Sequence, residues 1–174
     1  MAQYFVSPVG EGDVIYHVDY DKFFLVEAVE PLGLLEKDFG AISAGSKLEK
    51  QEFSELYPPR GFAIFVRILP VTANLAVYIR VFRETMRGAL KNATFYLTSW
   101  VTDNVEYHSL GEVWVFWDQK FYLDLEDLSG AGLSESKVRA VGYLYRLREI
   151  SEEEVGDRRV VRVRVQPIAT GATT

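Results

Sequence analysis

Residues 62–82 of this chain read FAIFVRILPVTANLAVYIRVF, and this stretch decides the fold class. Two runs, 62–69 and 75–82, alternate aliphatic side chains with aromatic or basic ones, which is the period-two pattern of a β-strand. Residues 70–74 separate the two runs, begin with proline and end with asparagine, as loops often do. We predict a β-hairpin here, with Pro70 facing Leu75 across its loop.

In this register the hairpin has two unlike sides, because cross-strand neighbours share a face. One side carries only aliphatic residues, which we predict to be core: Ile64, Val66 and Ile68 opposite Val81, Ile79 and Val77. The other side gathers rings and guanidinium groups, which we predict to be a binding patch: Phe65, Arg67, Tyr78, Arg80 and Phe82. The alternative is that this second side is also a core face, with the arginine stems lying along it.

Similar β-branched and aromatic runs recur along the rest of the chain. They lie at 14–18, 23–29, 95–101, 105–108, 113–117, 121–125, 138–150 and 159–166. Many short strands separated by turn residues are typical of an all-β fold. We therefore predict a mainly β protein, an antiparallel sandwich or barrel of about nine to eleven strands with one or two short helices. Residues 1–166 are expected to form one β-rich domain that ends in a hairpin of the last two runs, and 167–174 a disordered tail.

One helix is predicted at 46–57. Ser46-Lys47-Leu48-Glu49 fits a capping box, in which a serine and a glutamate satisfy each other's backbone amides. Apolar residues follow at roughly helical spacing, and two prolines at 58 and 59 would end the helix.

The composition removes several kinds of site. The chain has 174 residues and no cysteine, which excludes disulfides, cysteine-ligated zinc, iron–sulfur clusters and cysteine nucleophiles. No secretory signal and no membrane-spanning run is visible, so a cytoplasmic location without membrane contact is expected. Few thermolabile residues beside many Val, Glu and Arg suggest a thermophilic source.

Charge is distributed unevenly along the chain. The net charge is −6, yet residues 60–91 carry six basic side chains and one acid, and residues 137–166 carry eight basic side chains and five acids. Such asymmetry often marks a partner surface, so we add Arg162 and Arg164 to the predicted patch. The alternative is that folding brings the two signs together as ordinary surface pairs.

Three smaller groups are candidates for chemistry. His17, Asp19 and Asp21 would share one side of an extended strand, but the motif is short and we expect no metal there. The acids Asp118, Asp124, Glu126 and Asp127 sit among turn residues and are expected to be surface groups. The tryptophans Trp100, Trp114 and Trp117 could line an apolar cavity in a barrel, although such residues more often fill a core.

These features favour a non-catalytic binding or assembly module that uses the basic, aromatic hairpin face to contact an acidic partner. The partner is expected to be another protein or a second copy of the chain, with single-stranded nucleic acid as the alternative, since rings stack on bases and arginine neutralises phosphate. Two further functions stay open: a β-barrel that binds a small apolar or aromatic ligand, with or without enzymatic activity, and a self-assembling structural protein. No cofactor is expected.

Overall fold

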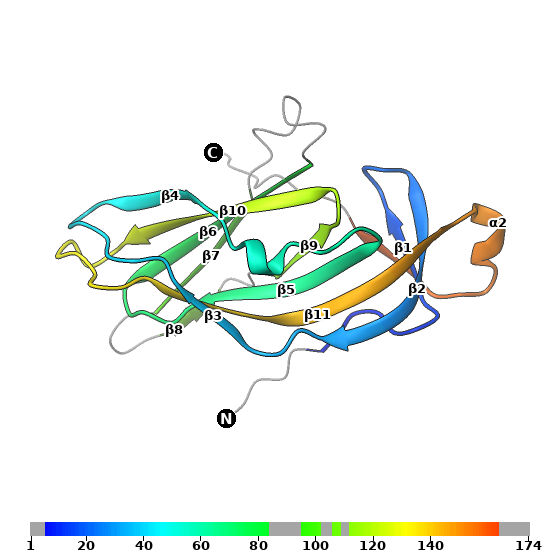
Figure 1. Ribbon diagram of the computed structural model, residues 1–174, viewed down its shortest axis with the longest axis horizontal. Helices are drawn as coiled ribbons and strands as arrows, with labels where there is room; N and C mark the ends of the chain where they lie inside the picture. The colour runs from blue at the N-terminus through cyan, green and yellow to red at the C-terminus, as the bar shows by residue number, and fades with distance from the viewer. Residues whose placement is uncertain (1–5, 84–94, 102–105, 109–111, 164–174) are drawn as a thin grey trace.

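The computed structural model describes residues 6–83, 95–101, 106–108 and 112–163, and it shows two β-sheets packed against each other (Figure 1). The seven-stranded sheet has the order β12 (Val160–Val163), β1 (Val14–His17), β2 (Lys22–Pro31), β11 (Lys137–Ile150), β5 (Phe62–Pro70) and β9 (Glu112–Phe116), with β3 (Leu35–Asp38) paired to β11. The five-stranded sheet has the order β4 (Lys47–Gln51), β10 (Gln119–Asp127), β6 (Leu75–Arg83), β7 (Phe95–Val101) and β8 (Glu106–His108). The predicted mainly β, antiparallel fold is confirmed. The sheets are not closed, so the sandwich alternative holds.

The predicted hairpin of residues 62–82 is wrong. The strand β5 pairs with β11 and β9, whereas β6 pairs with β10 and β7 in the other sheet. The segment between them crosses from one sheet to the other: the amide of Val71 donates to the carbonyl of Lys137 on β11, and the carbonyl of Asn74 accepts from the amide of Leu128 just after β10. The two strands therefore face each other across the sandwich.

The aliphatic sides of β5 and β6 form the centre of the inter-sheet core, as predicted. The six residues concerned are each at most 1% exposed: Ile64, Val66, Ile68, Val77, Ile79 and Val81. They belong to one cluster that also includes Phe53, Leu56 and Phe121. A strand with one wholly aliphatic side can bury that side against a second sheet whichever strand is hydrogen-bonded beside it. The pattern therefore predicted the core residues but not which strands pair.

A second cluster, the curl core, lies on the opposite face of the seven-stranded sheet. Its buried members are Val9, Ile15, Phe24, Val26, Ala63, Phe116, Tyr145, Leu147 and Val163. The His17 ring on β1 lies 4.6 Å from the Phe116 ring on β9, although these strands stand near opposite ends of the strand order. The sheet therefore curls around this cluster without closing into a barrel.

The predicted helix at 46–57 is also wrong. Residues Lys47–Gln51 form β4, which pairs with β10, and only a single 3-10 turn, η1 (Ser54–Leu56), follows it. Leu48 packs against the inter-sheet core, while Glu49 is exposed, and a register shift against β10 interrupts the alternation before Gln51. The capping box occurs elsewhere, at Ser151 and Glu154, where it opens the short helix α2 (Glu152–Val155).

The last two predicted strands form, but they do not pair as a hairpin. Strand β11 pairs with β2, β3 and β5, and β12 runs parallel to β1, with Val14 opposite Val160. The predicted tail, 167–174, lies outside the described residues. None of the helices that the structure describes has the length and apolar character needed to cross a lipid bilayer.

Candidate functional site

The predicted basic, aromatic patch does not form as a single surface. Phe65 and Arg67 lie on the curl-core side of the seven-stranded sheet, whereas Tyr78 and Arg80 lie on the outer side of the five-stranded sheet. Because the two sheets meet through their aliphatic sides, these two pairs stand on opposite faces of the sandwich. The side chain of Phe82 and all of Arg164 lie outside the description.

Two arginines of this prediction, Arg67 and Arg80, are paired with acids of the same chain. Arg67 on β5 bonds Glu112 on β9, with Nη2 2.5 Å from Oε2. Arg80 on β6 forms an ion pair with Asp124 on β10 and lies 3.8 Å from Glu49 on β4. Folding thus places these two arginines of the basic segment 60–91 beside acids from other parts of the chain. Arg162 is exposed, and its guanidinium lies 5.5 Å from the centre of the Tyr16 ring.

The acidic residues of β10 have structural partners. The hydroxyl of Tyr78 donates to Glu126 over 2.8 Å, and the backbone amide of Lys50 donates to Asp124 over 3.0 Å. Asp127 accepts four hydrogen bonds from two loops, and these bonds, led by that from the Ser129 hydroxyl, lower the pKa of Asp127 to about 2. These acids therefore connect neighbouring strands and loops through hydrogen bonds.

The predicted group of His17, Asp19 and Asp21, at the end of β1 and in the turn before β2, does not gather on one side. Strand β1 ends at His17, so the alternation on which the prediction relied stops there. The His17 ring is buried and stacks on the Tyr20 ring at 3.8 Å, whereas Asp21 accepts a hydrogen bond from Tyr16, whose side chain leaves the opposite face of β1. That bond raises the pKa of the Tyr16 hydroxyl. Within the described ranges, no three His, Asp or Glu side chains are grouped closely enough to hold a metal.

The tryptophans contribute to packing on the curled sheet. Trp114 and Trp117 both pack against the curl core, and the side chain of Trp100 lies outside the description. Trp114, Phe65 and Tyr143 stand directly opposite one another on β9, β5 and β11, and each is only half-buried. The rings of Phe65 and Trp114 are 4.9 Å apart. We call these three residues the aromatic row.

A hollow of about 200 Å³ lies on the core side of the seven-stranded sheet, just past the edge of the inter-sheet core. Five residues of β2, β5 and β11 line it: Ala28, Glu30, Phe62, Leu144 and Arg146. In Figure 1, β2 and the second half of β11 extend beyond the end of the five-stranded sheet. The hollow forms there because β11 is 14 residues long and continues where its covering sheet stops.

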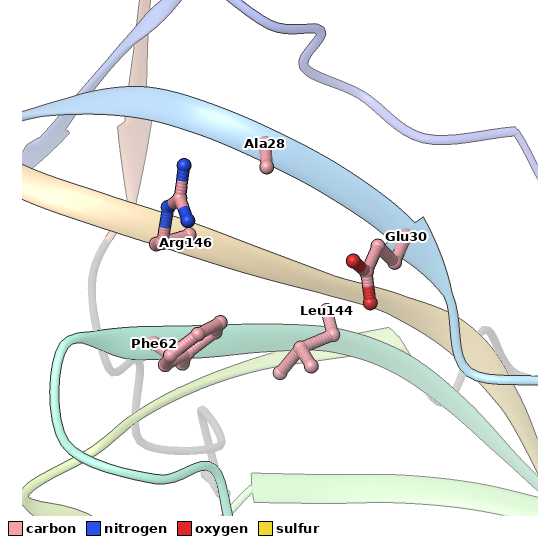
Figure 2. Close-up of a pocket in the computed structure, with 5 residues that line it drawn as sticks. All are labelled: Ala28, Glu30, Phe62, Leu144 and Arg146. Atoms are coloured by element: carbon pink, nitrogen blue, oxygen red, sulfur yellow. The ribbon is translucent and has the colours of Figure 1, made fainter.

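The hollow has an apolar floor between two charged side chains (Figure 2). The Phe62 ring and Leu144 lie along the bottom, while Arg146 and Glu30 stand on opposite sides. The Nε atom of Arg146 is 3.7 Å from Glu27, a residue displaced by an irregularity in the β2–β11 pairing, and Glu27 also contacts Arg148 at 3.2 Å. Among the described residues, no cation pairs with the exposed Glu30 carboxylate.

None of the residues that line the hollow was predicted from the sequence as a site residue, although one signal was present. On β11, every second residue from Val138 to Leu144 faces the inter-sheet core, and Arg146 continues that series. A charged residue that follows a run of core positions on the same side of a strand indicates that the cover ends there. Glu30 marks the same edge on β2, opposite Leu144.

Comparison of the chain with protein-family models, with curated proteins and with solved structures found no match. The functional argument therefore depends on the geometry described above.

Proposed function

We propose that this protein is a non-catalytic binding module and that the hollow between β2, β5 and β11 holds a small organic ligand. The observation that carries this proposal is the apolar floor of Phe62 and Leu144 between the opposite charges of Arg146 and Glu30. Ligand sites are typically concave and apolar, with a few polar groups that fix the orientation of the ligand. This function keeps the small ligand of the barrel alternative that the sequence left open, but not the barrel, because the two sheets are not closed.

The size and openness of the site define the class of ligand. A volume of about 200 Å³ lies below the range of roughly 300–1,000 Å³ for drug-sized ligands, so a smaller molecule is expected. Both charged side chains are exposed, so they orient the ligand more than they add affinity. For a ligand of about ten heavy atoms, these features support a dissociation constant on the order of 1 mM.

The proposal is tested by filling the hollow. Amide chemical shifts of the labelled protein are recorded while small amphipathic fragments are added, first to the natural protein and then to Ala28→Phe, whose ring would occupy the hollow. Leu34→Phe is the matched control, because Leu34 is 62% exposed and does not line the site. We expect shifts around Ala28 and Leu144 in the natural protein and in the control, and none in Ala28→Phe. Fragments that bind equally well to Ala28→Phe would overturn the proposal.

The aromatic row supports a second candidate function, assembly with another copy of this chain. Tyr143, Phe65 and Trp114 are half-buried, and the paired Arg67 and Glu112 lie two positions further along β5 and β9 on the same side of the sheet. Aromatic residues and arginine are the types enriched at protein interfaces. Because Arg67 already has an acid beside it, this surface no longer favours an acidic partner.

Light scattering after size exclusion, at low and high salt, tests this second candidate. We expect a dimer or larger species at high protein concentration that Phe65→Ser reduces, with Leu34→Ser as the control. A monomer at every concentration contradicts assembly. Fluorescence anisotropy with a labelled oligonucleotide at low salt tests the nucleic-acid alternative in the same samples. The cytoplasmic location and the thermophilic source stay predictions.

A further inference from the structure

We propose that the ligand of the hollow is a free α-amino acid with an apolar side chain, bound as a zwitterion. This inference rests on the proposed function of the hollow and adds the chemical class of its ligand. Three observations carry it: the opposite signs of Arg146 and Glu30, their separation across the strands, and the apolar floor between them.

The placement of the two charged residues suits a zwitterion. Arg146 pairs with Ala28 and Leu144 pairs with Glu30, so Arg146 and Glu30 are diagonal neighbours on adjacent strands. The Cα atoms of diagonal neighbours in a sheet lie roughly 7–8 Å apart. Figure 2 shows the two side chains on opposite sides of the hollow, so one small molecule between them can contact both. In an α-amino acid the ammonium nitrogen and the carboxylate carbon are about 2.5 Å apart by standard bond lengths, so both charges of the ligand lie in the same small space.

The signs of the charges select a dipolar ligand. A purely anionic ligand that bonds Arg146 would meet the Glu30 carboxylate, and a purely cationic ligand that bonds Glu30 would meet the guanidinium. A zwitterion places its carboxylate at Arg146 and its ammonium at Glu30, so both contacts are favourable. The nearest contact between Glu27 and Arg146 is at the Nε atom, over 3.7 Å. A carboxylate of the ligand would bond the two terminal nitrogens of Arg146.

The floor and the volume select the side chain of the amino acid. The Phe62 ring, Leu144 and Ala28 offer apolar surface, which an aliphatic or aromatic side chain would cover. A hollow of about 200 Å³ holds roughly seven water molecules at about 30 Å³ each, which is the scale of one amino acid. L-Leucine is therefore a suitable probe.

The test pairs each charge of the ligand with one residue of the protein. Binding of L-leucine, N-acetyl-L-leucine and L-leucinamide is measured by chemical-shift titration with the natural protein, Glu30→Gln and Arg146→Gln. N-acetyl-L-leucine lacks the ammonium, and L-leucinamide lacks the carboxylate. We expect Glu30→Gln to weaken leucine binding about two- to fivefold without further weakening N-acetyl-L-leucine, since exposed ion pairs contribute that much. Arg146→Gln should weaken leucine by a similar factor without further weakening L-leucinamide.

Arg148→Gln is the matched control, because Arg148 contacts Glu27 on the same strand pair but does not line the hollow. It should leave leucine binding unchanged. Equal binding of leucine and of the neutral N-acetyl-L-leucinamide would overturn the inference and point to a polypeptide segment as the ligand. If fragments bind in the hollow but leucine does not, the amino-acid class is wrong and the proposed function stands. If neither binds there, both fail.

Discussion

Asp127 shows at the scale of one residue how an acid can organise two loops. Its Oδ2 atom accepts from the amides of Gly45 at 3.0 Å and Gly132 at 2.9 Å, while Oδ1 accepts from the amide and the hydroxyl of Ser129. Gly132 is required at its position, since its φ is +87° and a Cβ atom would lie 3.2 Å from the carbonyl oxygen of Ile42. The loop after β10 and the loop before β4 are thus held together by one carboxylate.

The depressed pKa of Asp127 makes a prediction about pH. The pKa falls from 3.8 to about 2 on folding, so the ionised carboxylate stabilises the fold fully above about pH 4. This contribution is lost as the pH falls towards 2. We expect Asp127→Asn to be less stable than the natural protein at neutral pH, by a difference that is constant down to pH 5 and shrinks between pH 4 and pH 2. Urea unfolding across this range checks it, and a difference that persists unchanged at pH 2 contradicts it.

Ile79 tests the inter-sheet core. Its side chain is fully buried among aliphatic neighbours from both sheets, so Ile79→Ala removes buried surface and leaves a cavity. The free energy of unfolding should fall by about 2–5 kcal/mol. Leu34→Ala, at a position that is 62% exposed, should change it by less than about 0.5 kcal/mol. Denaturant melts of both variants give the comparison, and similar small changes in the two would place Ile79 outside the core.

At the scale of elements, two segments with the same local pattern adopt different structures. Ser46-Lys47-Leu48-Glu49 and Ser151-Glu152-Glu153-Glu154 both place a glutamate three residues after a serine. Only the second segment forms a capping box, with the Ser151 hydroxyl accepting from the Glu154 amide and the Glu154 carboxylate accepting from the Ser151 amide. In the first segment, Leu48 is drawn to the core and the backbone pairs with β10. Tertiary burial thus outweighs the capping signal.

The two serines provide a matched pair of variants. Ser151→Ala should cost about 1 kcal/mol of local stability in α2, because it removes the side-chain acceptor of the Glu154 amide, which then keeps only its bond to the Ser151 carbonyl. Ser46→Ala should change the free energy of unfolding by less than about 0.5 kcal/mol, since Ser46 is exposed and begins no helix. Hydrogen exchange at the Glu154 amide reports the first effect. Unchanged exchange in Ser151→Ala would contradict the cap.

Most strand positions were predictable from the sequence, although β3 and β4 were missed, and strand partners were not predictable. The alternation in 62–69 and 75–82 correctly predicted two strands and their aliphatic sides, because burial imposes a period of two on any strand with one core face. Nothing in that period distinguishes a hairpin partner from a strand of the facing sheet. The predicted basic patch required β5 to pair with β6, and it does not form because these strands belong to different sheets. The hollow depends on where the five-stranded sheet ends, and in the sequence only the charged residues Arg146 and Glu30 suggest that position.

At the scale of the whole molecule, the curl of the seven-stranded sheet joins distant turns. The hydroxyl of Tyr20, in the turn between β1 and β2, donates to Asp118 in the turn between β9 and β10 over 2.5 Å. The two residues are 98 positions apart in the chain. The stacking of His17 on Tyr20 and its contact with Phe116 lie beside this bond, so the turns are held by rings and by a hydrogen bond to a carboxylate.

Removing that hydrogen bond tests the curl. Tyr20→Phe keeps the ring and should lower the free energy of unfolding by roughly 1.5–3 kcal/mol, as expected for a bond to a charged acceptor. Tyr16→Phe is the control, because the Tyr16 hydroxyl bonds Asp21 only five residues away at an exposed site. Its effect should be clearly smaller. Equal effects of the two variants in thermal and urea unfolding would show that the contact between the turns adds no stability.

The parallel pairing of β1 with β12 has a consequence for how the chain folds during synthesis. The β1–β2 hairpin can form as soon as it leaves the ribosome, yet β1 receives its second neighbour only when β12 has been made, and the ion pair of Asp13 with Arg159 beside it spans 146 positions. Until then, one edge of β1 presents unpaired amides and carbonyls to other nascent chains. Translation speed and chaperones that shield such edges should therefore affect the yield of native protein.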